Sequence, residues 1–342
     1  MMAKLGDYVR IRTGKLDANA SNENGQYPFF TCAIEPLKID TYSYDCECVL
    51  VAGNGDLNVK YYNGKFDAYQ RTYIIESLDK TVLSIPYLYC FLDKYVETLR
   101  QQAIGGVIKY IKLGNLTEAE IPIPLITGQK KIVENLSKLN ELIALRKEQL
   151  SKLDELVKSR FVELFGDSVT NSMGWNTDTV IGVCDDIYGG GTPSKSHPEY
   201  YENGDIPWVS SKDMKTDILY DSQIKINQLG VDNSTAKMVP INSVIMVIRS
   251  GILKHTLPVA VNAVPITVNQ DLKVFIPSNR ILSIFLMHQF KMLEKDILSG
   301  VRAVTADNIE FDSLKKREII VPPMELQEQF AAFVEQTNKS KM

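Results

Sequence analysis

Residues 142–166 read LIALRKEQLSKLDELVKSRFVELFG, the last part of a longer stretch in which leucine, lysine and glutamate dominate. From Gly128 to Gly166 this stretch contains no proline and no internal glycine. Its apolar residues recur every three or four positions, at Ile132, Leu136, Leu139, Ile143, Leu150, Leu153, Val157 and Leu164, with Arg146 and Arg160 in the same seam. This heptad pattern predicts a long helix whose seam needs a partner helix to cover it. At about 1.5 Å per residue, Gln129 to Phe165 extends about 55 Å.

The sequence before this predicted helix is repeated after it, in the same order and at an offset of about 176 to 200 residues. The matched segments are Lys4–Asp7 with Val180–Val183, Ile11–Gly14 with Ile187–Gly190, Val49–Gly55 with Ile245–Gly251, Tyr69–Ile75 with Asn269–Phe275, and Leu116–Gln129 with Leu314–Gln327. Gly6 is thereby matched with Gly182, and Gly14 with Gly190. Each match is weak by itself, but the ordered series predicts two copies of one domain.

Each copy combines short strands with a helix. Cys48–Val51 and Ser243–Ile248 are apolar runs that predict buried strands, whereas Leu83–Arg100 and Ile281–Leu298 carry apolar residues at helical spacing. A second connecting helix is expected from Met324, antiparallel to the first. We therefore expect an α/β (α+β) fold of two repeated domains joined by long antiparallel coiled-coil helices. The expected boundaries are 1–124 and 167–322 for the domains, 125–166 for the central helix and 323–342 for a short distal helix.

Composition narrows the function classes. With 342 residues, 44% of them hydrophobic and 23% charged, the chain has the profile of two folded domains that each bury a core. It has no apolar run of about 18 residues, so we expect no membrane span, and its first residues show no secretion signal. Five cysteines and three histidines without metal-ligand spacing predict no metal, no cofactor and reduced thiols in the cytoplasm. The net charge of −4 is neutral to weakly unfavourable for DNA binding, although an average can hide a basic stripe.

At this point the sequence resembles the specificity subunits of type I restriction–modification systems. Leu142–Leu150, Lys152–Phe161 and Phe165–Asp167 look like that family's central connecting helix. Gly190–Ser194, Ile206–Ser210 and Asn269–Asp271 look like its target-recognition domain, and Pro322–Lys341 looks like the start of its distal helix. The resemblance covers essentially the whole chain. The departure is the distal helix of about twenty residues, which family members usually continue, so either the sequence stops short or the helices pair only partially.

The resemblance implies a DNA-binding specificity subunit with no catalytic site of its own. Its two target-recognition domains would each read one half of a bipartite site in double-stranded DNA, and its helices would dock methyltransferase subunits. A restriction or translocase subunit would join through the complex, and the chain could self-associate through its helices. With a helix of about 55 Å and about 3.4 Å per base pair, the half-sites should be centred no more than about 16 base pairs apart.

Polar residues that interrupt predicted strands are the first candidates for DNA contacts. Gln70 and Arg71 in the first copy, and Asn269 and Gln270 in the second, come from matched segments and lie within apolar strands. Arginine and the amide side chains can address base edges, while basic and hydroxyl groups fix a domain on phosphates. The alternative is that the two glutamines hydrogen-bond a neighbouring turn.

Loop residues form the second group of candidates. They are Arg249, Ser250 and Lys254 after a buried strand, and Ser210, Ser211 and Lys212 beside Trp208. Lys109 and Tyr110, after a Gly-Gly pair, and Arg302, after Ser299-Gly300, occupy similar places in the two copies. Loops leaving a rigid sheet commonly carry function. Each could equally be a solvated loop or a simple turn, and we expect Trp208 in the core.

The catalytic motifs that would indicate an enzyme are absent from the sequence. It contains no GxxxxGK[ST] phosphate loop, no GxGxxG dinucleotide fingerprint, no HExxH and no Asn/Asp-Pro-Pro-Tyr box. A base-flipping methyltransferase needs a cofactor pocket and a base pocket, and no motif supplies either. Two other interpretations stay open: a coiled-coil adaptor that binds protein, which the acidic balance fits, and a self-contained DNA-modifying enzyme. The target bases cannot be derived from the sequence.

Overall fold

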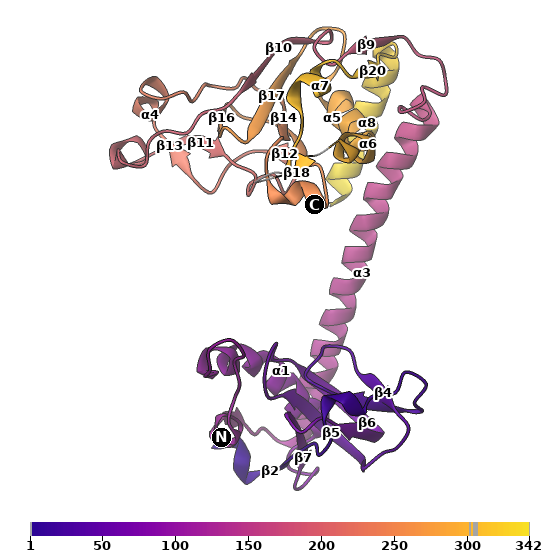
Figure 1. The fold of residues 1–342 in the computed structure, drawn as a ribbon, viewed down its shortest axis with the longest axis vertical. Helices are drawn as coiled ribbons and strands as arrows, with labels where there is room; N and C mark the ends of the chain where they lie inside the picture. The colour runs from indigo at the N-terminus through magenta and orange to yellow at the C-terminus, as the bar shows by residue number, and fades with distance from the viewer. Residues whose placement is uncertain (1, 301, 304–306, 342) are drawn as a thin grey trace. The chain divides into compact units, whose positions relative to one another are not determined.

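The computed structural model describes residues 2–300, 302–303 and 307–341. By their contacts the residues divide into two compact units, Met1–Arg146 and Lys147–Met342, here called unit 1 and unit 2. The predicted central helix is a single helix, α3 (Ile126–Phe165), which runs from unit 1 into unit 2 (Figure 1). The distal helix is α8 (Met324–Lys341). The ends of α3 and α8 lie within one or two residues of the ends expected for the two helical segments, 125–166 and 323–342.

Unit 1 is a six-stranded sheet covered on one face by a helix. The elements are β1 (Met2–Lys4), η1 (Leu5–Asp7), β2 (Val9–Thr13), η2 (Ala18–Ala20), β3 (Tyr27–Phe30), β4 (Leu37–Ile39), β5 (Tyr44–Ala52), β6 (Val59–Ala68), β7 (Thr72–Ser77), α1 (Ile85–Gln102), α2 (Leu113–Thr117) and β8 (Glu120–Pro122). The sheet order is β2-β7-β5-β6-β3-β4, with β3 parallel to β6. Strand β1 pairs separately with β8.

The second half of strand β5 is buried on both of its faces. Successive side chains of a strand point to opposite faces. Val49 and Val51 therefore pack with Leu88 of α1, while Cys48 and Leu50 pack with a smaller cluster on the other face. All four are at most 1% exposed, which explains why this strand reads as a continuous apolar run.

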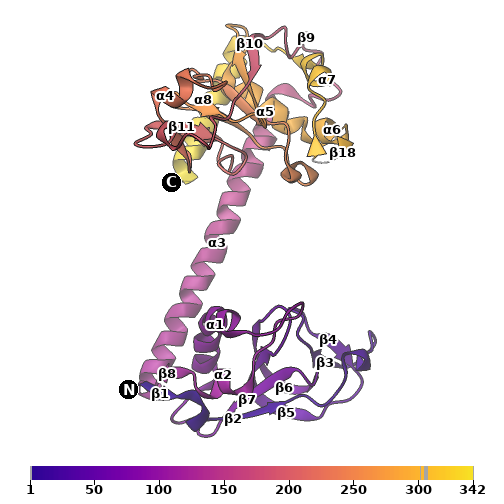
Figure 2. The same ribbon diagram turned by 60° about the vertical axis from the view of Figure 1, so that its left-hand side comes forward.

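Unit 2 repeats this arrangement with an enlarged loop region (Figure 2). Its elements are β9 (Thr177–Thr179), β10 (Cys184–Gly189), η3 (Pro198–Tyr200), β11 (Ile206–Val209), β12 (Ile218–Leu219), β13 (Lys225–Ile226), α4 (Gln228–Asp232), β14 (Val244–Val247), η4 (Gly251–Lys254), β15 (Val259–Asn262), β16 (Thr267–Val268), β17 (Leu272–Pro277), α5 (Ser283–Met292), α6 (Glu294–Ser299), β18 (Arg302–Ala303), β19 (Asp307–Asn308), α7 (Phe311–Lys315) and β20 (Glu318–Ile320). The order β10-β17-β14-β15 matches β2-β7-β5-β6, and β13-β11-β16 matches β4-β3-β6. The single helix expected over 281–298 is instead two, because the chain leaves helical geometry at Leu293.

A close approach of backbone confirms the match of Gly14 with Gly190. A Cβ on Gly14 would lie 2.1 Å from the Ala68 carbonyl oxygen, and one on Gly190 would lie 2.0 Å from that of Val268. No side chain fits so near a backbone oxygen, so glycine is required at the same point of both units.

The match of Gly6 with Gly182 is wrong by one residue. Lys4 pairs with Glu120 as Thr179 pairs with Glu318, so Gly6 corresponds to Ile181. The register of β10 shifts between Cys184 and Asp186, where a β-bulge adds one residue and restores the expected alignment further on. A similar slip occurs in the next match, because Leu50 and not Val49 takes the place of Ile245.

A buried glutamine begins each connecting helix. Gln129 is fully buried; its Oε1 accepts from the backbone N–H of Ser84 at 2.9 Å, and its Nε2 donates to the carbonyls of Val82 and Pro124. Gln327 repeats this pattern, accepting from the N–H of Leu282 at 2.8 Å and donating to the carbonyls of Arg280 and Pro322. The match of Leu116–Gln129 with Leu314–Gln327 therefore reflects a shared structural role, because each glutamine bonds the sheet domain to its connecting helix.

Within unit 2, α8 packs antiparallel to the end of α3, as the heptad pattern predicted. Phe161 and Phe165 of α3 contact Phe330 of α8 at ring-centroid distances of 5.4 and 5.7 Å, and both contact Phe285 of α5. Further along, Lys341 Nζ lies 2.6 Å from an Asp154 carboxylate oxygen. Later residues of α8 thus meet earlier residues of α3, so the two segments are antiparallel.

Unit 1 has an open groove where unit 2 has this aromatic joint. Ile132 and Tyr87, which correspond to Phe330 and Phe285, line a groove of about 510 Å³ together with Phe91 and Tyr95. The seam of α3 continues from it with Leu139 and Ile143 at 53% and 51% exposure. The same fold thus leaves an apolar surface uncovered in one unit and filled in the other.

None of the described helices is both long and apolar enough to cross a bilayer. Among the residues that the structure describes, no group of three or more His, Cys, Asp or Glu side chains is placed to hold a metal ion. All five cysteines are unpaired.

Candidate nucleic-acid interface

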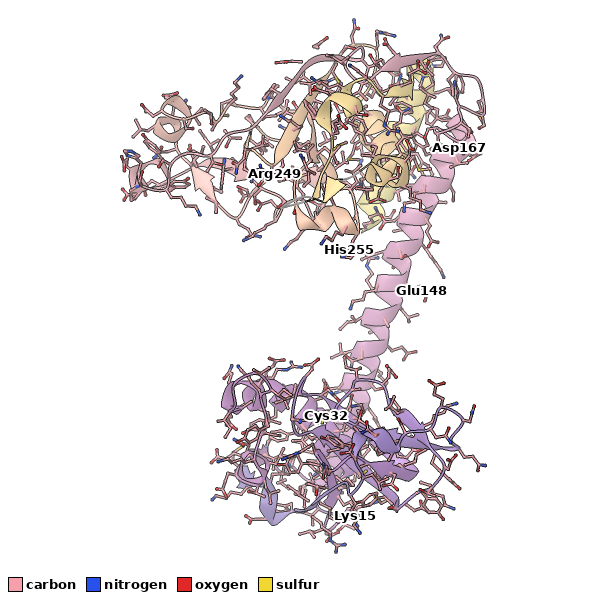
Figure 3. All side chains as sticks on the ribbon, in the orientation of Figure 1. Lys15, Cys32, Glu148, Asp167, Arg249 and His255 are labelled. Atoms are coloured by element: carbon pink, nitrogen blue, oxygen red, sulfur yellow. The ribbon has the colours of Figure 1, made fainter. Side chains whose placement is uncertain are left out.

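In unit 2 the candidate residues meet at one end of the sheet. The turn Asn269–Asp271 joins β16 to β17, and the Ile248 N–H, just past β14, donates to the Asp271 carbonyl at 2.9 Å. Arg249 then forms a bridge with Asn308 of β19, whose partner strand holds Arg302. The Asn269 N–H donates to the Val209 carbonyl at 2.9 Å, which brings Ser210–Lys212 to the same end. Figure 3 labels Arg249 and His255, which bracket the loop that contains Lys254.

Unit 1 builds the same end with the same backbone bonds. The Gly53 N–H donates to the Arg71 carbonyl at 2.8 Å, and the Gly55 N–H donates to the Lys109 carbonyl at 2.9 Å. Asn54 forms a bridge with Tyr110 as Arg249 does with Asn308. The structure therefore brings Gln70 and Arg71 together with Lys109 and Tyr110.

Two expectations about these positions are wrong in detail. Gln70, Arg71, Asn269 and Gln270 do not lie within strands; they lie at or beside the tight turn into the following strand, where Thr72 and Leu272 donate back to Tyr69 and Asn269. Because the chain reverses there, Gln70, Arg71 and Gln270 are exposed, whereas Asn269 is buried. Lys109-Tyr110 also does not correspond to Arg302, since the bridges align Tyr110 with Asn308 and Ile104 with Arg302.

The side chains at these ends differ in how far they are committed to other groups. Gln70, Arg71, Lys109, Tyr110, Lys212, Lys254 and Gln270 are exposed, and Ser211 is half-buried. Within the described part of the chain, Gln70 and Arg71 have no side-chain hydrogen bond or ion pair. Burial raises the pKa of Tyr73, and the positive charge of Arg71 acts in the opposite direction, so this guanidinium lies within electrostatic reach of the sheet end.

Several candidates are held by neighbours, and Arg249 is one of them. The Ser210 hydroxyl donates to Asp213 at 2.8 Å, and the Ser250 hydroxyl accepts from the Ile252 N–H at the start of η4. Gln270 accepts from Thr192, and Asn269 is buried with its amide against Asp271. The side chain of Arg302 lies outside the described residues.

Sequence reasoning missed Asp271, which forms an ion pair with Arg249 at 2.6 Å. Its only sequence signal was a carboxylate inside a matched turn whose other copy holds Arg71. Trp208, by contrast, is in the core as expected: it is 7% exposed, and its Nε1 donates to the Gly191 carbonyl at 2.9 Å.

Comparison with known proteins identifies the family. The family described as type I restriction modification DNA specificity domain matches residues 1–155 and again residues 173–341. The chain belongs to this family. The two matches correspond to the two units and to the internal repeat.

Relatives in this family are named as specificity subunits. The chain is 37% identical over 155 residues to the type I restriction enzyme EcoDI specificity subunit of Escherichia coli, covering 45% of this chain and 34% of that protein. It is 31% identical over 264 residues to the EcoR124I/EcoR124II specificity subunit of Escherichia coli, covering 75% of this chain and 63% of that protein. The chain therefore matches between a third and two thirds of the length of these relatives.

Solved structures show the same fold. The type I restriction–modification S subunit from M. genitalium matches with a TM-score of 0.63 at 16% identity, over 100% of this chain and 90% of that one. A chain from a structure described as showing complex assembly and conformational transition of the type I R-M system matches with a TM-score of 0.56, also at 16% identity, over the same shares of both chains. At this identity the likeness establishes the architecture alone.

Proposed function

We propose that this chain selects the DNA sequence in a type I restriction–modification complex, with each unit reading one half of a bipartite site in double-stranded DNA. One observation carries the proposal: the polar candidates of both units gather at the same end of the same repeated sheet. The family membership supplies the ligand class. A repeated domain that presents a repeated surface fits a split site, because each copy can occupy one half.

The side chains at each sheet end divide into two kinds of contact. Exposed Lys109, Lys212 and Lys254 are suited to phosphates, which fix a domain on the duplex without reading it. The exposed amide of Gln70 is suited to a base edge, where glutamine can pair with adenine, whereas the amide oxygen of Gln270 already accepts from Thr192. Loops anchored on a rigid sheet can hold such groups in register.

We infer that methyltransferase subunits dock on the helices and that a restriction subunit joins through them, with no catalysis by this chain. The exposed seam of α3, including Leu136, Leu139 and Ile143, supports a helical partner there, and a second copy of this chain could be that partner. Five unpaired cysteines fit the reducing cytoplasm that this function requires.

The test is selection from a random duplex library by the purified chain, with and without its cognate methyltransferase subunit, at moderate salt. We expect a split motif with a fixed, unspecified spacer, and affinity that falls steeply as salt rises. Absence of enrichment in both conditions would overturn the proposal and favour the protein adaptor, to which the net charge of −4 also points.

A further inference from the structure

One pair of neighbouring positions at the sheet end holds different residues in the two units. In unit 2 these positions hold Arg249 and Asp271, and in unit 1 they hold Asn54 and Arg71. The equivalence rests on backbone bonds, because Ile248 N–H donates to the Asp271 carbonyl just as Gly53 N–H donates to the Arg71 carbonyl. Each unit thus has one arginine at this place. Arg249 takes the position that Asn54 holds in unit 1, whereas Arg71 takes the position that Asp271 holds in unit 2.

Arg249 is held firmly along one edge of its guanidinium. Its Nε donates to Asp271 Oδ1 at 2.7 Å, and its Nη2 lies 2.6 Å from the same oxygen. Asp271 is itself fixed, since its N–H donates to Asn269 Oδ1 at 3.1 Å and its Oδ2 accepts from Asn269 Nδ2 at 3.2 Å. Asn269 is buried at 7% exposure, so the chain of contacts ends in the core.

The Arg249 side chain remains half-exposed although Asp271 holds one edge of its guanidinium. The side chain of Arg249 is 49% exposed, whereas that of Asp271 is 25% exposed. A guanidinium carries five N–H donors in a planar fork, and Asp271 engages only the Nε side of it. Within the described residues no other side chain bonds Arg249. The N–H groups of Nη1 and the outer N–H of Nη2 therefore remain available to a ligand with two adjacent acceptors.

Resting on the function proposed above, we propose that Asp271 is a positioning residue that presents Arg249 to a guanine in the half-site read by unit 2. Guanine offers O6 and N7 side by side in the major groove, and arginine contacts both at once. A guanidinium already held in place loses less conformational entropy on binding, so the correct base gains more from it.

The carboxylate also argues for a base and against a phosphate as the ligand. The Arg249–Asp271 pair has no net charge, so it displaces few counterions and adds little to sequence-independent affinity. Its N–H donors keep their direction, which is what base reading needs. Among the described residues, the Arg71 side chain of unit 1 forms no ion pair with a carboxylate, so it is suited to phosphate.

The experiment repeats the library selection with variants of the whole chain in complex with its methyltransferase subunit. Arg249→Ala should abolish a preference for guanine at one position of one half-site, a loss of about tenfold or more. Arg249→Lys keeps the charge but not the fork and should lose the same preference. Asp271→Asn should reduce it several-fold, and Asp271→Glu should restore part of it.

Arg71→Ala is the matched control in the other unit. It should leave that position unchanged and lower the slope of log Kd against log salt by about 0.9, while Arg249→Ala leaves the slope nearly unchanged. The inference would be overturned if Arg249→Ala lowered the affinity for all sequences alike and reduced the slope of log Kd against log salt. It would also be overturned if this variant lost its preference for a base other than guanine. If the wild-type complex itself enriches no motif, the proposed function fails instead. Circular dichroism and a thermal melt show that each variant is folded; if Arg249→Ala is not, Arg249→Lys decides.

Discussion

Units 1 and 2 share one backbone plan but differ in what fills its two ends. At the helix end, both keep a buried glutamine, Gln129 or Gln327, yet only unit 2 covers the neighbouring surface with Phe161 and Phe165. At the loop end, both keep the same backbone bonds, while Arg249 and Arg71 come from different positions. The repeated parts are those that hold the sheet to its helix. The divergent parts are those that would meet a partner or DNA.

The aromatic joint of unit 2 gives the largest expected difference between the units. Phe161 is fully buried and contacts Phe165, Phe285 and Phe330, so Phe161→Ala should destabilise unit 2 by about 3–5 kcal/mol. Both tryptophans, Trp175 and Trp208, belong to unit 2, so the urea dependence of tryptophan fluorescence reports its unfolding.

The comparison in unit 1 is Ile132→Ala, at the position that corresponds to Phe330, the residue that Phe161 contacts in unit 2. Ile132 is 38% exposed beside the open groove, so this change should lower the free energy of unfolding of unit 1 by less than about 1 kcal/mol. The tyrosine signal in the near-ultraviolet circular dichroism of the same samples measures it. Equal losses in the two variants would mean that the groove of unit 1 is as well covered as the joint of unit 2.

The two glutamine joints should respond alike, in contrast to the aromatic joint. Gln129→Ala and Gln327→Ala each leave a part-buried backbone N–H and its neighbouring carbonyls without their side-chain partner, at a cost of about 1–3 kcal/mol. Hydrogen exchange of the Ser84 and Leu282 amides measures this directly, and both should become faster. Protection retained at one of the two would show that the repeated glutamine has kept its role in only one unit.

Acid should separate the units further, because unit 2 buries a histidine where unit 1 has Cys90. Burial lowers the pKa of His288 to about 3, with the charge of Lys291 acting in the same direction, and the Nε2 of His288 has no hydrogen-bond partner among the described residues. The folded-state pKa lies below the ordinary value of 6.5, so the unfolded state binds more protons between these values. Stability is therefore present above pH 6.5 and is lost as pH falls toward 3.

At pH 5 this loss should reach about 2 kcal/mol, while most carboxylates are still ionised. Urea unfolding of unit 2 by tryptophan fluorescence at pH 7 and pH 5 measures it. His288→Cys, which copies unit 1, should show a much smaller difference between the two pH values. The same drop in this variant would assign the effect to another group.

Periodicity and repetition were enough to predict the architecture. The heptad seam predicted α3 to within a residue or two, and the ordered matches predicted two domains with helices that pair antiparallel. Both signals are spread over many residues, so one misplaced residue does not destroy them. The one-residue slips at Gly6 and Val49 show the limit, because a β-bulge or a turn changes the register without a signature in a single sequence.

The sequence predicted which polar residues would share a region of each unit, but not which of them would bond to their neighbours. Polar residues in matched segments did gather at one sheet end, since matched segments fold to matched places. Which of them are committed to neighbours could not be predicted, because Arg249 meets Asp271 and Ser210 meets Asp213 only through the geometry of two turns. The sequence places Asp271 in the matched turn but does not show that its carboxylate meets Arg249.

The smallest expected effect distinguishes Ser210 from Lys212, two neighbours at the loop end of unit 2. The Ser210 hydroxyl is donated to Asp213 at 2.8 Å, so it has no hydrogen left for a phosphate, and Ser210→Ala should change DNA affinity less than about twofold. Lys212 is exposed, so Lys212→Ala should weaken binding to all sequences alike and lower the salt slope by about 0.9. Fluorescence anisotropy of a labelled duplex across a salt series measures both. A larger effect from Ser210→Ala than from Lys212→Ala would show that the Ser210–Asp213 bond opens when DNA binds, and that the loop end of unit 2 rearranges around its ligand.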